Sequence, residues 1–294
     1  RPPVKEVATN VFVESSYPPY NLVLIKTEKG GIIVDVPPNP VHALTWIEQA
    51  RAAGGPLRYV VFTDAGRERQ LATAFCEVPV IATETMLRIM AGYSEERARR
   101  EYFDLLTSRY PEEMGALDGA RPRKPAIAFN SAFTLYADGM TLQFEAVEGA
   151  APGSLWLLIP EHSLLIAGDT VVVNVPPAME ATPNSKAWLN TMAGLAHRQT
   201  VKGIVPGRGP AWINRGDIES QREFMRVMRR AARTLARKSA NGLSLTQTAQ
   251  ELQQTFFNRS GQKAVKLLRA GLERLVAEVV DAEDGGPDDQ DETV

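Results

Sequence analysis

Histidine and cysteine, the side chains that most often bind zinc in proteins, are scarce in this sequence. Its 294 residues include three histidines and one cysteine. The single cysteine, Cys76, excludes an internal disulfide, and in an apolar stretch without a neighbouring histidine we expect it to pack rather than to react. His42, His162 and His197 fall at a helix start, in a turn and at a helix end, where surface histidines are expected.

The sequence also lacks a charge excess and a long apolar run. Its 33 basic and 35 acidic residues give a net charge of −2, which does not favour a nucleic acid or an anionic membrane as a partner. No apolar run approaches the roughly 20 residues of a membrane-spanning helix, and no secretory signal pattern opens the chain. We therefore expect no membrane partner and a cytoplasmic location, and the sequence leaves open whether a leader preceded Arg1.

A charged loop after a short strand is the first feature that could be a functional site. Residues 59–62 predict the strand, Thr63 ends it, and a helix-like run follows from Gln70 to Cys76. In α/β folds, chemistry is usually placed at the carboxyl ends of strands. The loop contains two acids and two bases, which are Asp64, Arg67, Glu68 and Arg69. Taken alone, this window favours a surface loop whose charges neutralise one another.

Three later segments change that interpretation, because each joins a strand to a polar turn. They are Glu148–Leu155, which contains Pro-Gly-Ser-Leu, Leu164–Thr170, which ends in Gly-Asp-Thr, and Gly203–Pro210, which ends in Pro-Gly-Arg-Gly-Pro. Further matches lie at residues 21–35 and 133–144. In this order and at this spacing, the chain from about Val4 to Trp212 resembles the metallo-β-lactamase superfamily.

The resemblance covers the frame of that superfamily but not its zinc ligands. The family's zinc loop is Thr-His-x-His-x-Asp-His, and its ligand positions here hold Asp64, Gly66, Glu68 and Arg69. Two further expected histidines are Ala150 and Arg208, and only the bridging acid of Gly-Asp-Thr is kept, as Asp169. All five histidines are absent. The resemblance therefore implies a degenerate member of the superfamily, in which zinc is not expected.

If the loops keep the family's arrangement, Asp64, Glu68 and Asp169 converge. Clustered carboxylates must take up protons or a cation. We hypothesise that Arg69 and Arg208 supply the positive charge in a metal-free, ion-paired pocket, because the planar guanidinium group binds carboxylates through paired hydrogen bonds. The simpler alternative is that these side chains drifted after activity was lost and now face solvent.

Two functions are compatible with this pocket, and the sequence leaves open whether the chain is an enzyme. In the first, the pocket binds a small anion, such as a carboxylate or phosphate, or the C-terminal helices bind a protein partner. In the second, Asp64, Glu68 and Asp169 hold one hard divalent cation, which hydrolyses an ester or a phosphoester. The arginines oppose the second function, because they would repel the cation.

The resemblance implies an α/β (α+β) fold, an αβ/βα sandwich of two sheets with helices outside, over residues 1–214. Residues 215–280 predict a helical extension, with an arginine stripe on its first helix. Its last helix has a coiled-coil-like seam, and this seam suits packing back on the domain as well as homo-oligomerisation. The seam residues are Val265, Leu268, Leu272, Leu275 and Val279. Residues 281–294 have seven acids and no base and predict a disordered tail.

Overall fold

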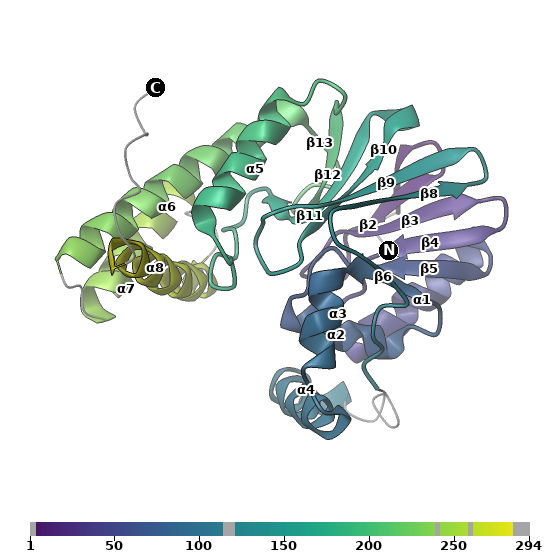
Figure 1. Cartoon of the computed structure of the whole chain (residues 1–294), viewed down its shortest axis with the longest axis horizontal. Coiled ribbons are helices and arrows are strands. Elements are labelled where there is room, and N and C mark those ends of the chain that lie inside the picture. The colour runs from purple at the N-terminus through teal and green to yellow at the C-terminus, as the bar shows by residue number, and fades with distance from the viewer. Residues whose placement is uncertain (1–3, 114–120, 239–241, 258–260, 285–294) are drawn as a thin grey trace.

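The computed structural model describes residues 4–113, 121–238, 242–257 and 261–284. Two β-sheets pack face to face between layers of helices (Figure 1). The first sheet has the strand order β1-β2-β3-β4-β5-β6-β7. Its strands are β1 (Lys5–Ala8), β2 (Val11–Glu14), β3 (Leu22–Thr27), β4 (Gly30–Val34), β5 (Leu57–Val61), β6 (Val80–Thr83) and β7 (Ile127–Phe129). Strands β4 to β7 run parallel, so their carboxyl ends meet at one edge.

The second sheet has the order β13-β12-β11-β10-β9-β8. Its strands are β8 (Ala132–Ala137), β9 (Met140–Ala146), β10 (Leu155–Ile159), β11 (Leu164–Val172), β12 (Gly203–Arg208) and β13 (Ile213–Asn214). Strands β11 and β12 are its parallel pair. The second half of the chain therefore also brings two carboxyl ends together.

Both faces of each sheet are buried, as strand β10 illustrates. Leu155, Leu157 and Ile159 pack in the core between the sheets, whereas Trp156 and Leu158 pack in the core beneath the outer helices. Side chains alternate between the two faces of a strand, so an unbroken apolar run buries both faces. The αβ/βα sandwich predicted from the sequence is confirmed.

Helices from the two halves of the chain cover opposite faces of the sandwich (Figure 1). Those beside the first sheet are α1 (Pro40–Gly54), α2 (Arg67–Ala72), η1 (Thr73–Phe75), α3 (Glu84–Ala91) and α4 (Glu95–Arg109). Those beside the second sheet are α5 (Ser185–His197), η4 (Arg215–Ile218), α6 (Glu219–Arg237), α7 (Gly242–Phe256) and α8 (Gly261–Asp284), and η3 (Pro160–His162) joins β10 to β11. No helix in the described ranges is long and apolar enough to cross a membrane.

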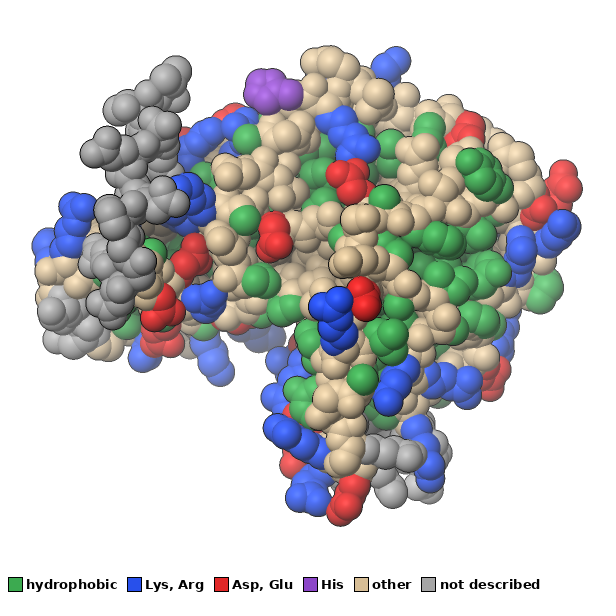
Figure 2. All heavy atoms as spheres, in the orientation of Figure 1, with side chains coloured by type: hydrophobic (Ala, Val, Ile, Leu, Met, Phe, Trp, Pro, Cys, Tyr) green, Lys and Arg blue, Asp and Glu red, His purple; other side chains and the backbone are tan. Residues whose placement is uncertain are grey.

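The charge-rich segment between Thr83 and Tyr110 forms two helices. Helix α3 ends at Ala91, and the Ser94 side chain accepts a hydrogen bond of 3.1 Å from the Arg97 backbone, which starts α4. Four-residue spacing then pairs Arg97 with Glu101 on the solvated face. Figure 2 shows basic and acidic side chains intermixed on the projection that Figure 1 labels α4.

The helical extension packs back on the sandwich. Leu268, Leu272 and Leu275 of the predicted seam are buried in one core with Met225 and Met228 of α6. The structure therefore shows the first of the two uses expected for this seam. Helix α8 continues to Asp284, past the predicted end at residue 280, and the rest of the predicted tail lies outside the described residues. The division into domains at residue 214 stays a prediction.

Candidate functional site

Four polar side chains meet where the parallel strands of the two sheets end. Asp35 follows β4, Asp64 follows β5, Asp169 lies in β11, and Arg208 ends β12. All of these except Asp35 line an open pocket of about 620 Å³, and the five residues predicted for the site all line it. These are Asp64, Glu68, Arg69, Asp169 and Arg208.

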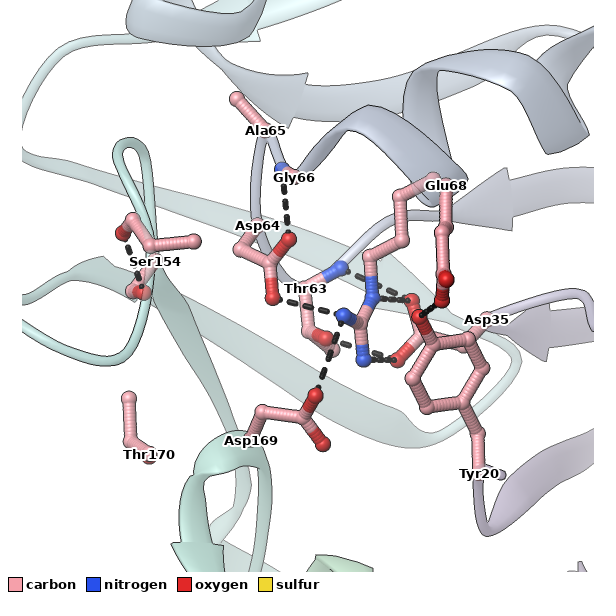
Figure 3. Close-up of polar contacts among 12 residues, drawn as sticks. Tyr20, Asp35, Thr63, Asp64, Ala65, Gly66, Glu68, Ser154, Asp169 and Thr170 are labelled. Atoms are coloured by element: carbon pink, nitrogen blue, oxygen red, sulfur yellow. Dashed lines mark hydrogen bonds and ion pairs between the residues drawn. The ribbon is translucent and has the colours of Figure 1, made fainter. Parts of the chain in front are cut away.

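Arg69 is the centre of this arrangement and is only 2% exposed. Its Nε and Nη2 donate to the two carboxylate oxygens of Asp35 at 2.9 and 3.0 Å. Its Nη1 donates to Asp64 at 2.7 Å and to Asp169 at 3.4 Å (Figure 3). One buried guanidinium group thus contacts three buried carboxylates. Such a charge is tolerated in a protein interior only when it is paired.

Asp35 is the partner that the sequence analysis missed. It is buried, and its Oδ1 and Oδ2 also accept hydrogen bonds of 3.0 and 2.6 Å from the backbone and hydroxyl of Thr63. These bonds hold the end of β5, from which Asp64 projects. The one available signal was an acid directly after a buried strand, in the 21–35 match.

Arg208 completes the ion-paired floor of the pocket. Its Nη2 donates to Asp169 at 2.9 Å, and its Nε lies 3.3 Å from each oxygen of the same carboxylate. Its side chain is 23% exposed. Its Nη1 makes no hydrogen bond within the described parts of the chain. The ion pairs expected of both arginines are therefore present, and Arg208 keeps one side open to the pocket.

Glu68 does not join the other acids. Its Oε2 accepts a hydrogen bond of 2.7 Å from the Tyr20 hydroxyl, and it forms an ion pair with Arg109 at the end of α4. The expected convergence of Glu68 with Asp64 and Asp169 is wrong, because α2 begins at Arg67 rather than at Gln70. Successive residues of a helix point about 100° apart. Arg69 therefore enters the core while Glu68 faces the pocket rim.

Tyr20 presents the face of its ring to both arginines. The guanidinium carbon of Arg69 is 4.1 Å from the centre of the Tyr20 ring, and that of Arg208 is 5.3 Å away. Cations are attracted to the face of an aromatic ring. The ring therefore adds a favourable contact to each of the two guanidinium groups.

The two acids beside Arg69 differ in their titration. Burial raises the pKa of Asp64 from 3.8 to about 6, against the opposing effect of Arg69. Burial also acts to raise the pKa of Asp169, but Arg208 and Arg69 outweigh it, so this pKa lies below its ordinary value. The positive charge around Asp169 thus outweighs the effect of its burial, whereas the positive charge around Asp64 does not.

The side chains of this pocket do not suit a zinc ion. Zinc requires a set of imidazole, thiolate or carboxylate groups with free lone pairs. Here Arg69 lies among the three carboxylates, and arginine has no lone pair to donate to a metal. Among the residues that the structure describes, no group of three or more His, Cys, Asp and Glu side chains could hold a metal ion.

The remaining candidates lie apart from this chemistry. Cys76 is buried, and burial raises the pKa of its thiol to about 12, which agrees with a packing role. His42 was expected at the surface but is half-buried and lines the pocket, beside the ring of Tyr17. Within the described residues, no hydrogen bond joins the His42 ring to the charged floor.

Comparisons with known proteins agree with this architecture. No family model and no curated protein sequence matches the chain. Among solved structures, a metallo-β-lactamase family protein from Thermus thermophilus is 18% identical with a TM-score of 0.66, and 95% of each chain is covered. A metallo-β-lactamase from Pontibacter korlensis is 17% identical with a TM-score of 0.56, covering 76% of this chain and 98% of its own.

The chain has the metallo-β-lactamase fold. A sec-alkylsulfatase from Pseudomonas sp. with this fold is 15% identical with a TM-score of 0.59, and the match covers 97% of this chain and 52% of that one. The match over nearly the whole chain shows that the helical extension also has a counterpart in a solved structure. Identities this low establish a shared fold and leave the chemistry to the residues at the site.

Proposed function

We propose that this chain is a zinc-free member of its fold class that binds a small anion on Arg208. The proposal rests on the guanidinium group of Arg208, which is paired on one side and open to the pocket on the other. Its Nε and Nη2 hold Asp169, while its side chain remains partly exposed on the floor of the pocket. Arginine is a strong receptor for carboxylates and phosphates and a poor metal ligand.

The charges around the pocket set the strength of such binding. Arg67 and Arg109 also line it, although each is paired with a glutamate. Glu180 lines the same pocket and interacts electrostatically with Arg208. An incoming anion would therefore be attracted by Arg208 and repelled by Glu180.

A cation-dependent hydrolase is not favoured by this geometry. Asp64 and Asp169 are both bonded to Arg69, and Glu68 is directed to Tyr20 and Arg109. The three acids therefore do not form the oxygen-ligand shell that a hard divalent cation requires. The sulfatase activity named for the structural neighbour is not transferred to this chain, because arginines stand among its acids. Cytoplasmic location and homo-oligomerisation stay predictions from the sequence.

Calorimetric titration with acetate, sulfate and phosphate tests the proposal. We expect at least one of these anions to bind, and Arg208→Gln to weaken that binding by about tenfold or more, since a charge-assisted hydrogen bond contributes about 1.5–3 kcal/mol. Arg198→Gln is the matched control. Arg198 has a similarly exposed side chain, 29%, is paired with Glu145 at 2.7 Å, and lies outside the pocket lining.

Glu180→Gln gives an independent change of opposite sign. Removing its negative charge near Arg208 should strengthen anion binding several-fold at low ionic strength, and added salt should reduce this gain. Binding that is equal in wild type, Arg208→Gln and Arg198→Gln would contradict the proposed site, as would the absence of binding by all three anions.

A further inference from the structure

Helix α8 contributes directly to the pocket, although it begins about 50 residues after β12 ends in the sequence. Leu267, on the second turn of α8, lines the cavity with a partly buried side chain. Its neighbours in the chain, Leu268 and Ala264, are buried in the core instead. The extension is therefore part of the site as well as a cover for the second sheet.

The same helix holds the loop between β11 and α5, which forms another part of the pocket wall. Arg274 donates hydrogen bonds to the backbone carbonyls of Thr182 and Pro183 at 3.1 and 2.8 Å. Glu278 accepts bonds from the backbone and hydroxyl of Ser185 at 3.1 and 2.9 Å. These contacts fix the loop residues Ala178 and Ala181, which line the pocket.

A close approach between helix and loop explains a glycine in the middle of α8. A Cβ atom on Gly271 would lie 3.2 Å from the Cβ of Met179 and 3.3 Å from the terminal methyl of Met228. A side chain at position 271 would therefore be too close to Met179 unless the loop or the helix moved by a few tenths of an ångström. The packing thus sets the distance between α8 and the segment that contains Ala178 and Ala181.

Apolar side chains from three separate segments consequently face the same cavity as the charged floor. They are Pro18 and Pro19 before β3, Ala178 and Ala181 in the loop, and Leu267 on α8. The cavity of about 620 Å³ has room for about 20 water molecules at roughly 30 Å³ each. A small inorganic anion on Arg208 would leave most of this volume and the apolar wall in contact with water.

We propose that the ligand is an organic monocarboxylate with an apolar body, and that Leu267 determines which chain lengths the pocket accepts. The carboxylate binds Arg208, and the apolar body covers Leu267 and the two alanines of the loop. One carboxylate suits the floor better than a doubly charged anion, because Asp64, Asp169 and Glu180 also lie there. This inference rests on the proposed anion site.

Calorimetric titration with straight-chain carboxylates from acetate to octanoate is the test. In the wild type we expect the dissociation constant to fall by up to about fourfold for each added methylene that becomes buried. Leu267→Ser should flatten this dependence on chain length, so that its ratio of octanoate to acetate affinity falls below that of the wild type. Leu267→Met should restore it, because methionine offers a similar apolar surface.

Val280→Ser is the matched control, since Val280 is an exposed residue of α8 outside the pocket lining and should not alter the chain-length dependence. Acetate binding without any gain from acetate to octanoate would overturn this inference and leave the anion site intact. An equal gain in Leu267→Ser would assign the apolar contact elsewhere and overturn the role of Leu267. Failure of every carboxylate to bind would also overturn this inference, and the anion site itself would be removed only if sulfate and phosphate failed to bind as well.

Discussion

Replacing Arg69 with methionine is expected to lower the free energy of unfolding by about 3–5 kcal/mol at pH 7.5. Methionine has a similar length and apolar stem, so the change removes mainly the charge and its hydrogen bonds. Asp35, Asp64 and Asp169 would then be buried without the cation that contacts all three. Arg208 reaches only Asp169, so it cannot substitute.

Urea unfolding followed by tryptophan fluorescence measures this loss. Arg67→Met is the control on the same helix, because Arg67 is exposed and pairs only with Glu101. Exposed ion pairs contribute at most about 1 kcal/mol. The deficit of Arg69→Met should also shrink in acid as the carboxylates take up protons. A loss no larger than that of Arg67→Met would show that Arg69 is not the cation on which the floor depends.

Asp64→Asn is expected to gain stability relative to the wild type as the pH rises. A carboxyl whose folded-state pKa is raised, here from 3.8 to about 6, binds its proton more tightly in the folded protein. Its contribution to stability is therefore greatest below pH 3.8 and is lost as the pH rises through about 6. Asparagine does not titrate and keeps one oxygen, which can accept from either Gly66 or Arg69, where the carboxylate accepts from both. The difference in unfolding free energy between variant and wild type should grow by roughly 2 kcal/mol from pH 4.5 to pH 7.5.

Asp169→Asn should show the opposite dependence on pH. The pKa of Asp169 is lowered, so its ionised form stabilises the folded protein above the ordinary value of 3.8, and this stability is lost as the pH falls through the lowered pKa. The deficit of the variant should be full at pH 7.5 and should shrink in acid. Urea titrations of both variants at several pH values measure these changes in the free energy of unfolding. The same sign for both variants would contradict the charge distribution described for the pocket.

The resemblance in sequence identified the frame of this site because its motifs depend on the backbone. The turn at Gly207 packs against Asp169, where a Cβ on the glycine would lie 2.4 Å from the carboxylate oxygen. Such a position admits only glycine, so the motif can be recognised whatever side chains stand beside it. The sequence alone therefore places Arg208 and Asp169 at one site.

The rest of the site depends on partners that are distant in the sequence or on helix phase. Asp35 is 34 residues from Arg69, and nothing in its local sequence distinguishes a buried ion-pair partner from a strand-ending acid. Glu68 and Arg69 are adjacent in the sequence, but the early start of α2 sends them in different directions. Local sequence patterns therefore predict neither the pairing of Asp35 with Arg69 nor the directions in which Glu68 and Arg69 point from α2.

In the helical extension, too, the spacing of the apolar residues could be predicted from the sequence, but their contacts could not. The spacing of Leu268, Leu272 and Leu275 predicted a helix with one apolar face, and α8 has this face. The period does not state what covers the face. Leu267 was outside the predicted seam, and its place in the pocket follows from how α8 packs against the loop before α5.

The metal content of the purified protein, before and after incubation with zinc and manganese, tests most directly the claim that Arg69 and Arg208 take the place of a metal. We expect no stoichiometric metal in either case, because the site has no free set of ligands. A stoichiometric metal that Asp64→Asn and Asp169→Asn reduce would contradict the claim. It would mean that these carboxylates leave the arginines and coordinate the metal instead.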